Sequence, residues 1–396
     1  MTNTVDLTVI GAGPSGLVSA LWAARQSLTV CLLERKKGPL DRGHADGLEP
    51  RTLEILDSLG LADNLWKQAN RTVEICTWCD PSGQLRRTSR RPNYARGTSR
   101  YQEATLHQGH IEKALVSALE REPGVTICWN SVSTSLEVAE DVMKFPVSVA
   151  WHSGEGKVQH RVRSHYVVGC DGAHSWTRSQ IGVEMNGNNT EELWGVVDII
   201  PQTDFPDIRC RCIIRSASNT IMIIPREGHM VRFYVRLHDL EPDSHKASPL
   251  FNQILAQIRT VLAPYTLDFD VCDWWSSYQI RQQLATAFSD PLHRVFLAGD
   301  AIHKHSPKAG QGLNVSIQDA WNLGWKLAAV IKGQAGSALL RTYEIERRPV
   351  AQRLLSFDKK MLGCFQSFSV CRESNGHGND SLEAAIEEEH SSASGI

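Results

Sequence analysis

The clearest chemical signal in the sequence is a glycine-rich turn, GAGPSG, that follows an apolar run near the N-terminus. Its glycines have the Gly-x-Gly-x-x-Gly spacing of dinucleotide-binding turns. Gly11 permits the tight turn, Gly13 lets a pyrophosphate approach the backbone, and Gly16 lets a helix and a strand pack closely. Pro14 and Ser15 complete the turn, and the N-terminus of the following helix attracts phosphate. The turn therefore predicts a nucleotide-binding site.

A carboxylate and a second glycine turn extend this signal. Glu34 ends the next apolar run, at the distance where a carboxylate binds an adenosine ribose. The spacing alone does not distinguish NAD from FAD, and a glycine turn in an unrelated α/β protein is the alternative. Far along the chain, AGDAIHKHSPKAGQGLN (298–314) begins where another apolar run ends, at Gly299 and Asp300. A second glycine turn that follows an apolar run so late in the sequence predicts a discontinuous nucleotide domain. It also predicts a long ligand that reaches both glycine turns.

Histidines and cysteines give no metal-binding pattern. His303 and His305 lack a third ligand at a suitable spacing, so we interpret them as structural residues with hydrogen-bond partners. Cys76 and Cys79 form a single CxxC without a second pair, which favours two thiols on a strand over zinc or redox chemistry. We therefore predict no metal. The other cysteines mostly stand singly in apolar runs, as expected in a reduced, cytosolic compartment.

The elements that would position these residues alternate between strand and helix. Strands are predicted at 5–10, 29–34, 125–129, 145–151, 165–171, 267–275 and 294–300, and helices at 17–26, 50–60, 111–121, 249–263 and 312–333. Residues 194–237 alternate like antiparallel sheet. The arginine-rich stretch 86–100 is predicted to be a solvated loop rather than a phosphate patch, because Pro92 and Gly97 break any regular face. The fold class is α/β: a discontinuous Rossmann-like domain with an inserted mixed or antiparallel sheet domain.

Composition and charge describe an ordinary globular chain. Hydrophobic residues make up 41% of its 396 residues, and the net charge of −2 argues against a nucleic-acid or membrane-surface binder. No apolar run approaches the ~20 residues that span a bilayer. The N-terminus enters a strand without a basic region or a cleavage-like site, so we predict a cytoplasmic protein. From about residue 366 the sequence is polar and rich in Ser, Gly and Glu, which predicts disorder.

Three further segments make a family resemblance specific. They are GCDGAHSWTR (169–178), the second glycine turn, and DAWNLGWKLA (319–328). In this order after GAGPSG, they resemble the single-component FAD-dependent aromatic hydroxylases of the para-hydroxybenzoate hydroxylase type. Within that group the sequence looks most like the phenol 2-monooxygenases, through HADGLEPRTLEIL (44–56), HQGHIEKAL (107–115) and IMIIPREGHMVRFYVRL (221–237). The resemblance runs from about residue 5 to about residue 362.

The resemblance implies FAD as the cofactor, with NADPH as co-substrate. It implies that Glu34 and Arg35 bind the adenosine end of FAD, and that Gln108 and Asp300 bind the middle of the cofactor. Asp171 belongs to a motif that the family uses for both FAD and NADPH, although a structural turn is an equal alternative, and Arg178 is a phosphate partner. Gly310 and Gly312 would leave room for the flat ring, and the helix N-terminus beside it would stabilise an anionic reduced flavin. The other implied contacts are Gly11, Gly13, Pro14, Ser15, Gly16, His44, Ala45, Asp46, Tyr234, Gln311, Leu313 and Asn314.

The same resemblance implies the chemistry of ring hydroxylation. A flavin C4a-hydroperoxide is an electrophile, so the aromatic ring must be electron-rich, and a phenol with a pKa near ~10 needs help to lose its proton. Asp46 and Tyr234 match the pair that binds and deprotonates the phenol, and Arg226 matches the arginine beside the flavin. Tyr278 lines the pocket. Taken alone, these residues have ordinary alternatives: a turn for Asp46, core packing for Tyr234, and an ion pair for Arg226.

The sequence thus predicts a monooxygenase that uses FAD, NADPH and O2 to hydroxylate a phenol ortho to its hydroxyl. The predicted FAD-binding domain comprises 1–75, 101–185 and 285–365, the substrate-binding domain 76–100 and 186–284, and the disordered tail 366–396. From the resemblance we expect this chain to lack the family's thioredoxin-like C-terminal domain, which supports its homodimer. Lys304 stands where a smaller neutral residue is usual in the family. Two alternative functions stay open. The first is a flavin-dependent reductase or halogenase, although IMIIPRE lacks the tryptophans of the halogenases. The second is a truncated, non-catalytic FAD-binding protein.

Overall fold

A mixed seven-stranded sheet forms the first layer of the fold. The computed structural model describes residues 3–80, 84–93, 97, 99–139, 143–154, 158–216, 219–237, 247–306 and 310–366. Five strands of the first sheet run parallel, in the order β8, β2, β1, β11, β17, and β10 and β9 continue antiparallel from β11. The strands are β1 (Asn3–Ile10), β2 (Val30–Leu33), β8 (Val125–Cys128), β9 (Ser131–Val138), β10 (Val147–Ser153), β11 (Val158–Gly169) and β17 (Val295–Leu297).

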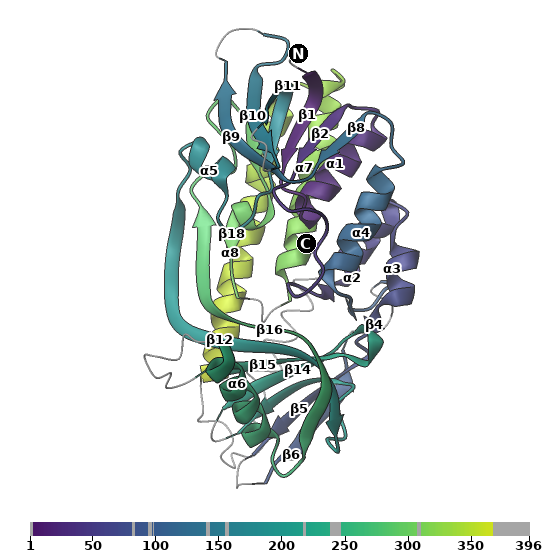
Figure 1. The fold of residues 1–396 in the computed structure, drawn as a ribbon, viewed down its shortest axis with the longest axis vertical. Coiled ribbons are helices and arrows are strands. Elements are labelled where there is room, and N and C mark those ends of the chain that lie inside the picture. The colour runs from purple at the N-terminus through teal and green to yellow at the C-terminus, as the bar shows by residue number, and fades with distance from the viewer. Residues whose placement is uncertain are drawn as a thin grey trace.

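Helices pack against this sheet and against one another. The main ones are α1 (Pro14–Arg25), α2 (Pro50–Ser58), α3 (Ala62–Gln68), α4 (Gln108–Leu119) and α7 (Gly312–Ile331). Helices α1 and α7 lie side by side (Figure 1), and a Cβ on Gly324 of α7 would come within 2.8 Å of the Trp22 side chain on α1. The apolar faces of these helices share one core with β1, β2 and β11. The 3₁₀ turn η2 (Gly299–Ala301) and the N-terminus of α7 are thereby brought next to GAGPSG.

An eight-stranded sheet forms the second part of the fold. Its order is β18-β16-β12-β15-β14-β13-β5-β6. The strands are β5 (Glu74–Cys79), β6 (Arg86–Pro92), β12 (Met185–Thr203), β13 (Arg211–Arg215), β14 (Thr220–Pro225), β15 (Val231–Leu237), β16 (Leu267–Ala285) and β18 (His303–Lys304). Figure 1 shows that β12 and β16 are the long strands that connect this sheet with the first part of the molecule.

The two faces of the second sheet bury different side chains, because residues alternate along a strand. On β15, Phe233 packs into the core that includes α6 (Ala247–Leu262), whereas Tyr234 packs into a second cluster. Phe357 and Met361 of α8 (Ala338–Gln366) belong to this second cluster, and α8 runs from beside α7 to the second sheet (Figure 1). The Tyr234 face of the sheet therefore looks toward the first part of the fold.

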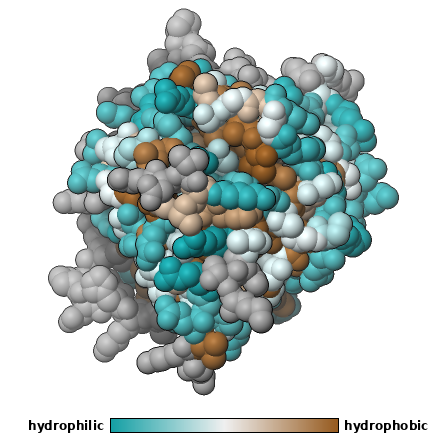
Figure 2. Space-filling model, turned by 90° about the horizontal axis from the view of Figure 1, so that it is seen from above, coloured by the Kyte–Doolittle hydropathy of each residue, from teal (hydrophilic) through white to brown (hydrophobic). Residues whose placement is uncertain are grey.

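Short elements complete the connection between the two parts. A three-stranded sheet joins the chain around residue 47 to the chain around residue 105, and η1 and α5 lie at two turns. These elements are β3 (Gly47–Leu48), β4 (Asn70–Arg71), β7 (Ala104–Thr105), η1 (Glu227–His229) and α5 (Trp176–Gln180). Seen from above in Figure 2, hydrophilic residues cover most of the face, and apolar residues show between them. No helix among the described residues is long and apolar enough to cross a membrane.

The structure confirms the α/β fold class and corrects three local predictions. Cys79 is disulfide-bonded, whereas Cys76 is a free thiol, so the pair is not two free thiols on a strand. The stretch 86–100 is not a loop throughout, because Arg86–Pro92 forms β6 and pairs antiparallel with β5 at the sheet edge. Helix α8 has 29 residues and was not predicted. The domain boundaries remain a prediction, and the predicted disordered tail lies outside the described residues except for Gln366.

Candidate functional site

The GAGPSG turn is closed on one side and open on the other. Gly11 has a φ of +101°, and a Cβ there would lie 2.3 Å from the carbonyl oxygen of Cys170. A Cβ on Gly16 would lie 1.8 Å from the carbonyl oxygen of Gly11. A Cβ on Gly13, in contrast, would meet no atom of the described part of the chain within 4 Å. The turn thus has the tight backbone expected of a phosphate-binding turn, with room at Gly13 for the ligand.

Glu34, the predicted ribose contact, lies next to the first glycine turn. It follows the C-terminal end of β2, the neighbour of β1, and is buried. Its carboxylate accepts hydrogen bonds from the backbone N–H of Ala12 at 2.6 Å and of Lys36 at 2.8 Å. Each carboxylate oxygen retains acceptor capacity for a ribose hydroxyl. Arg35 beside it is exposed.

The η2 turn places Asp300 beside the first glycine turn. Gly299 has a φ of +64°, and a Cβ there would lie 3.0 Å from Ser15 Oγ and 2.9 Å from Ser316 Oγ. The turn is therefore wedged between the N-terminal ends of α1 and α7. Asp300 is exposed, and within the described ranges its carboxylate has no hydrogen bond. It is available to a hydroxyl of the cofactor's sugar-like chain.

Hydrogen bonds fasten the second glycine turn to the segment around residue 47. Asn314 donates from Nδ2 to the carbonyl oxygens of Gly310 and Gly47, at 2.8 and 3.1 Å, and accepts from the Glu49 N–H at 2.9 Å. Gln311 Nε2 donates to Glu49 Oε1 at 3.1 Å. Residues 307–309 of the turn lie outside the described ranges. The predicted contacts of the flavin ring are therefore held against the strand that follows Asp46.

Helix α4 fixes the other side of the same segment. The backbone N–H of Gln108 donates to the Ala45 carbonyl at 3.2 Å, and that of Leu106 donates to the Asp46 carbonyl at 2.8 Å. The Gln108 side chain donates to Glu112 Oε1 at 2.8 Å. Gln108 and the second glycine turn thus approach residues 44–48 from different elements. Leu313, in the same turn, is buried.

Asp171 and Arg178 are engaged within the protein. The Asp171 carboxylate accepts from the Thr177 N–H at 2.8 Å and the Thr177 hydroxyl at 3.0 Å, and it also binds Ser175, so it organises the start of α5. Arg178 donates to the carbonyl oxygens of Ala301 and Ala173 at 3.0 and 3.2 Å. These contacts support the structural alternative for Asp171, and a cofactor or phosphate role for either residue remains a prediction.

The histidines of the second turn have structural partners. His303 Nε2 lies 2.9 Å from Asp319 Oδ2, and Asp319 also accepts from Arg347 Nε at 2.6 Å. His305 Nδ1 lies 2.7 Å from the carbonyl oxygen of Ser306. Neither histidine belongs to a group of metal-ligating side chains in the described ranges. Lys304 is partly buried, and this burial, with Arg178 and Arg281 nearby, lowers its pKa.

Asp46 meets two arginines in a buried cluster. Asp46 Oδ2 lies 3.4 Å from Arg226 Nε and 3.3 Å from Arg232 Nη1, and all three side chains are buried. Among the described residues, neither Asp46 Oδ2 nor Arg226 Nε has a hydrogen-bond partner of good geometry. A buried acceptor without a donor costs roughly 1–3 kcal/mol. The structure thus presents a carboxylate oxygen that a ligand hydroxyl would satisfy.

Asp198 orients both arginines. Arg232 Nε and Nη2 each donate to it at 2.7 Å in a two-pronged contact, and Arg226 Nη1 donates at 2.6 Å. Asp198 on β12 and Arg232 on β15 are cross-strand partners in the register of the sheet. The carbonyl oxygen of His44 accepts from Arg232 Nη1 at 2.6 Å, which draws the Asp46 segment onto the sheet. Neither Asp198 nor Arg232 was predicted, although each interrupts an apolar strand with a charge.

Aromatic side chains surround the charged cluster. Tyr234 Oη lies 3.4 Å from Arg232 Nη1, and burial is the main cause that raises the Tyr234 pKa to about 12. The Arg232 guanidinium lies 5.4 Å from the ring centre of Trp274. The Tyr278 hydroxyl is buried without a hydrogen bond to the described residues, and burial raises its pKa as well. The predicted catalytic residues Asp46, Tyr234 and Arg226 therefore meet at one place.

The comparisons with known proteins identify the family. The family model described as "FAD binding domain" matches residues 4–358. The chain belongs to this family. The fit of the residues to FAD agrees: Gly13 leaves room for a pyrophosphate, Asp300 is exposed for a hydroxyl, and Asp46 Oδ2 lacks a donor.

Its relatives include enzymes that hydroxylate aromatic rings. The chain is 39% identical over 372 residues to a phenol 2-monooxygenase of Aspergillus fumigatus, covering 92% of this chain and 61% of the relative. It is 38% identical over 387 residues to a 3-hydroxybenzoate 4-monooxygenase of Comamonas testosteroni, covering 92% of this chain and 60% of the relative. The structure of p-nitrophenol 4-monooxygenase from Pseudomonas putida shares the fold, with a TM-score of 0.81 at 22% identity and 98% coverage of both chains.

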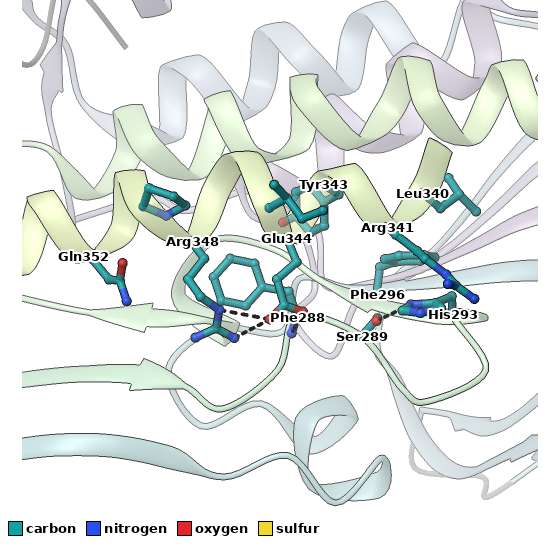
Figure 3. Close-up of a pocket in the computed structure, with 12 residues that line it drawn as sticks. Phe288, Ser289, His293, Phe296, Leu340, Arg341, Tyr343, Glu344, Arg348 and Gln352 are labelled. Atoms are coloured by element: carbon teal, nitrogen blue, oxygen red, sulfur yellow. Dashed lines mark hydrogen bonds and ion pairs between the residues drawn. The ribbon is translucent and has the colours of Figure 1, made fainter. Parts of the chain in front are cut away.

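A separate pocket lies away from this site. It has a volume of about 400 Å³ and lies between the first half of α8 and the chain before β17 (Figure 3). Its lining includes Phe288, Phe296 and Tyr343, and the Glu344–Arg348 ion pair at 2.6 Å. None of the predicted site residues lines it. We assign it no part in the chemistry of the site.

Proposed function

We propose that the chain, with FAD bound, hydroxylates a phenolic compound at the ring carbon next to its hydroxyl, using NADPH and O2. The observation that carries the proposal is Asp46 Oδ2, a buried carboxylate oxygen without a hydrogen-bond donor, held between Arg226 and Arg232. The two guanidinium groups pair with this oxygen by charge without hydrogen-bond geometry, so a phenol O–H could donate to it. FAD, once reduced by NADPH, supplies the chemistry that activates O2 for transfer to an electron-rich ring.

The residues at this position would act on the phenol's proton. In water a phenol with a pKa of ~10 is ionised to only about one part in a thousand at pH 7, a cost of about 4 kcal/mol. Asp46 would accept the proton, and the two guanidinium groups would stabilise the negative charge that develops on the ring oxygen. Tyr234 would donate its hydroxyl to the same oxygen, because a pKa of about 12 keeps it protonated at neutral pH.

The charges of the cluster favour a phenol without a carboxylate. Arg226 and Arg232 face Asp46 and Asp198, so the positive and negative charges of these four residues balance. A substrate carboxylate entering beside them would find neither arginine unpaired. The surrounding wall includes Trp194, Met222 and other apolar side chains. We therefore propose an uncharged phenol in preference to a hydroxybenzoate.

The names of the relatives support the position of attack. Phenol 2-monooxygenase and 3-hydroxybenzoate 4-monooxygenase both name the carbon next to the ring hydroxyl. The p-nitrophenol 4-monooxygenase names the opposite carbon, but it shares only 22% identity with this chain. The higher identity of the first two relatives supports ortho hydroxylation.

One experiment tests the proposal. The purified chain would be reconstituted with FAD, and NADPH and NADH oxidation would be followed with phenol, with substituted phenols and with 3-hydroxybenzoate. We expect NADPH oxidation that uncharged phenols stimulate more strongly than 3-hydroxybenzoate. A chain that binds FAD but gives no hydroxylated product with any phenol would support a non-catalytic flavoprotein instead. Stronger stimulation by 3-hydroxybenzoate would contradict the argument from charge balance.

The remaining expectations belong to the same proposal. We propose the domain boundaries given above, a homodimer and a cytoplasmic location. Sedimentation of the FAD-bound chain tests the dimer, and limited proteolysis tests the boundaries. Lys304, partly buried near Arg178, adds positive charge beside the second glycine turn.

A further inference from the structure

Three metal-ligating side chains meet beside strands β5 and β13 of the second sheet. Cys76 lies on β5, and Asp207 and Cys210 lie in the turn between β12 and β13. Their ligand atoms, two sulfurs and one carboxylate oxygen, all lie within 4.8 Å of one another. Cys76 and Asp207 are buried, whereas Cys210 is partly exposed. We call these three residues the thiol cluster. None of them belongs to the flavin and phenol site.

We propose that the thiol cluster binds a divalent, thiophilic metal ion such as Zn²⁺, with Cys76, Cys210 and Asp207 as ligands. Ligands of tetrahedral zinc lie about 2.0–2.3 Å from the ion, so neighbouring ligand atoms are about 3.3–3.8 Å apart. Since the ligand atoms lie within 4.8 Å of one another, each pair needs to approach by about 1.5 Å at most to reach that geometry. Cys210 can supply this movement, since it lies in a bend and is only partly buried.

Surrounding residues hold the carboxylate ligand in place. Arg87 donates to both oxygens of Asp207, at 2.7 and 2.9 Å, and Trp78 Nε1 donates at 2.9 Å. Outer hydrogen bonds of this kind orient metal ligands. One lone pair of Asp207 Oδ1 stays available to the ion. The charge also balances, because two thiolates and a carboxylate offset the ion together with Arg87.

Cys212 supports the site without binding the ion. It is the register partner of Cys76 across the parallel β5–β13 pair. Its sulfur donates to the carbonyl oxygens of Asp207 and Cys210, each at 3.4 Å. Because the Cys212 S–H is engaged in these two contacts, we assign the fourth position of the ion to water from the exposed side of Cys210. The ion would tie β5 to the 207–212 turn.

Cobalt substitution tests this site, because Co²⁺ bound to thiolates gives charge-transfer and intense visible bands that a flavin-free sample shows clearly. The full chain, reduced and freed of FAD, would be titrated with CoCl2 and then with ZnCl2. We expect one Co²⁺ per chain, displaced by Zn²⁺. We expect at least tenfold weaker binding in Cys210→Ser, and no change in Cys128→Ser. Cys128 is a matched control because it is also partly exposed and contacts another thiol, that of Cys31.

Three outcomes overturn the proposal. They are the absence of thiolate bands in the reduced chain, equal Co²⁺ binding by Cys210→Ser, and weakening by Cys128→Ser instead. A Cys76–Cys210 disulfide that forms in air, together with no metal binding after reduction, would assign the cluster to redox chemistry and also refute the metal site. Asp207→Asn is a second variant: it keeps the shape of the side chain, and we expect it to weaken Co²⁺ binding while the thiolate bands persist.

Discussion

The sharpest prediction concerns Asp46→Asn. The substitution keeps the shape of the side chain but removes the charge that would take the phenol's proton. Arg226 and Arg232 keep their contacts with Asp198 at 2.6 to 2.7 Å, so the cluster and the fold should persist. We therefore expect a change in the chemical step, with FAD still bound.

The magnitude follows from the phenol's ionisation. A substrate with a pKa of ~10 is three units from neutrality, so complete loss of the base costs about 4 kcal/mol at pH 7, or about a thousandfold in rate. The two arginines remain and offset part of this cost, so we expect a loss of about 10²–10³. A phenol whose pKa is near ~7 is already half ionised, and the loss for this substrate should be below about tenfold.

The assay compares the two enzymes on the same substrates. Single-turnover product formation would be measured for wild type and Asp46→Asn with a weakly acidic and a more acidic phenol, from pH 6.5 to 9. The more acidic phenol has an electron-poor ring, which lowers its reactivity in both enzymes. This effect cancels in the ratio of the wild-type rate to the variant rate. With the weakly acidic phenol, the variant's rate should rise about tenfold per pH unit. An equal loss for both phenols, or a loss of FAD, would refute the role of Asp46 as base.

Three further predictions follow from the same contacts. Gly13→Ala should leave the free chain folded, because its Cβ would meet no described atom within 4 Å. The same variant should weaken FAD binding at least tenfold in a flavin-fluorescence titration. In Gly16→Ala the Cβ would lie 1.8 Å from a carbonyl oxygen, so this variant should instead lower the melting temperature of the chain. Asp198→Asn leaves two buried guanidinium groups with weaker partners and should cost about 3–5 kcal/mol in denaturant unfolding, and a cost below about 1 kcal/mol would contradict the assigned anchor. Burial raises the pKa of Tyr234 to about 12 in the folded chain, so above pH 10 the unfolded chain loses this proton first and stability falls by about 2 kcal/mol by pH 12. Tyr234→Phe should remove that part of the loss, keep FAD bound and slow hydroxylation. An unchanged alkaline stability profile would refute the burial of this hydroxyl.

Patterns close together in the sequence predicted the local backbone structure of the first glycine turn. The glycine spacing and the position of Glu34 depend on one strand, one turn and one helix, so local sequence specifies them. The structure bears out the strained Gly11 and the close contact at Gly16. Whether these residues hold FAD as assigned stays a prediction.

The charged cluster could be predicted only in part. Asp46, Arg226 and Tyr234 came from segments that resemble a family, and the structure brings them together. Asp198 and Arg232 were not predicted, because their pairing depends on the register of two strands whose residues lie 34 positions apart, and a single sequence does not show that register. A charge inside each apolar strand was the available signal, since a buried charge needs a partner.

Two elements were wrong or missing for identifiable reasons. Strand β6 is rich in arginine and ends at Pro92, features typical of a loop, but an edge strand tolerates both. Helix α8 contains Pro349 and many charges, which weaken a helix pattern. Its apolar residues, among them Tyr343, Leu354 and Met361, are nevertheless buried at helical spacing. Packing against α7 and β16 thus outweighs the local signal.

The central claim is that this chain, with FAD, transfers an oxygen atom from O2 to a phenol beside its hydroxyl. The most direct measurement is the mass of the product formed under ¹⁸O2 with NADPH and phenol. The account predicts a catechol that carries one ¹⁸O atom in the wild-type chain and a greatly reduced yield of it in Asp46→Asn. NADPH consumption with no labelled catechol, or label at the para carbon, would contradict it.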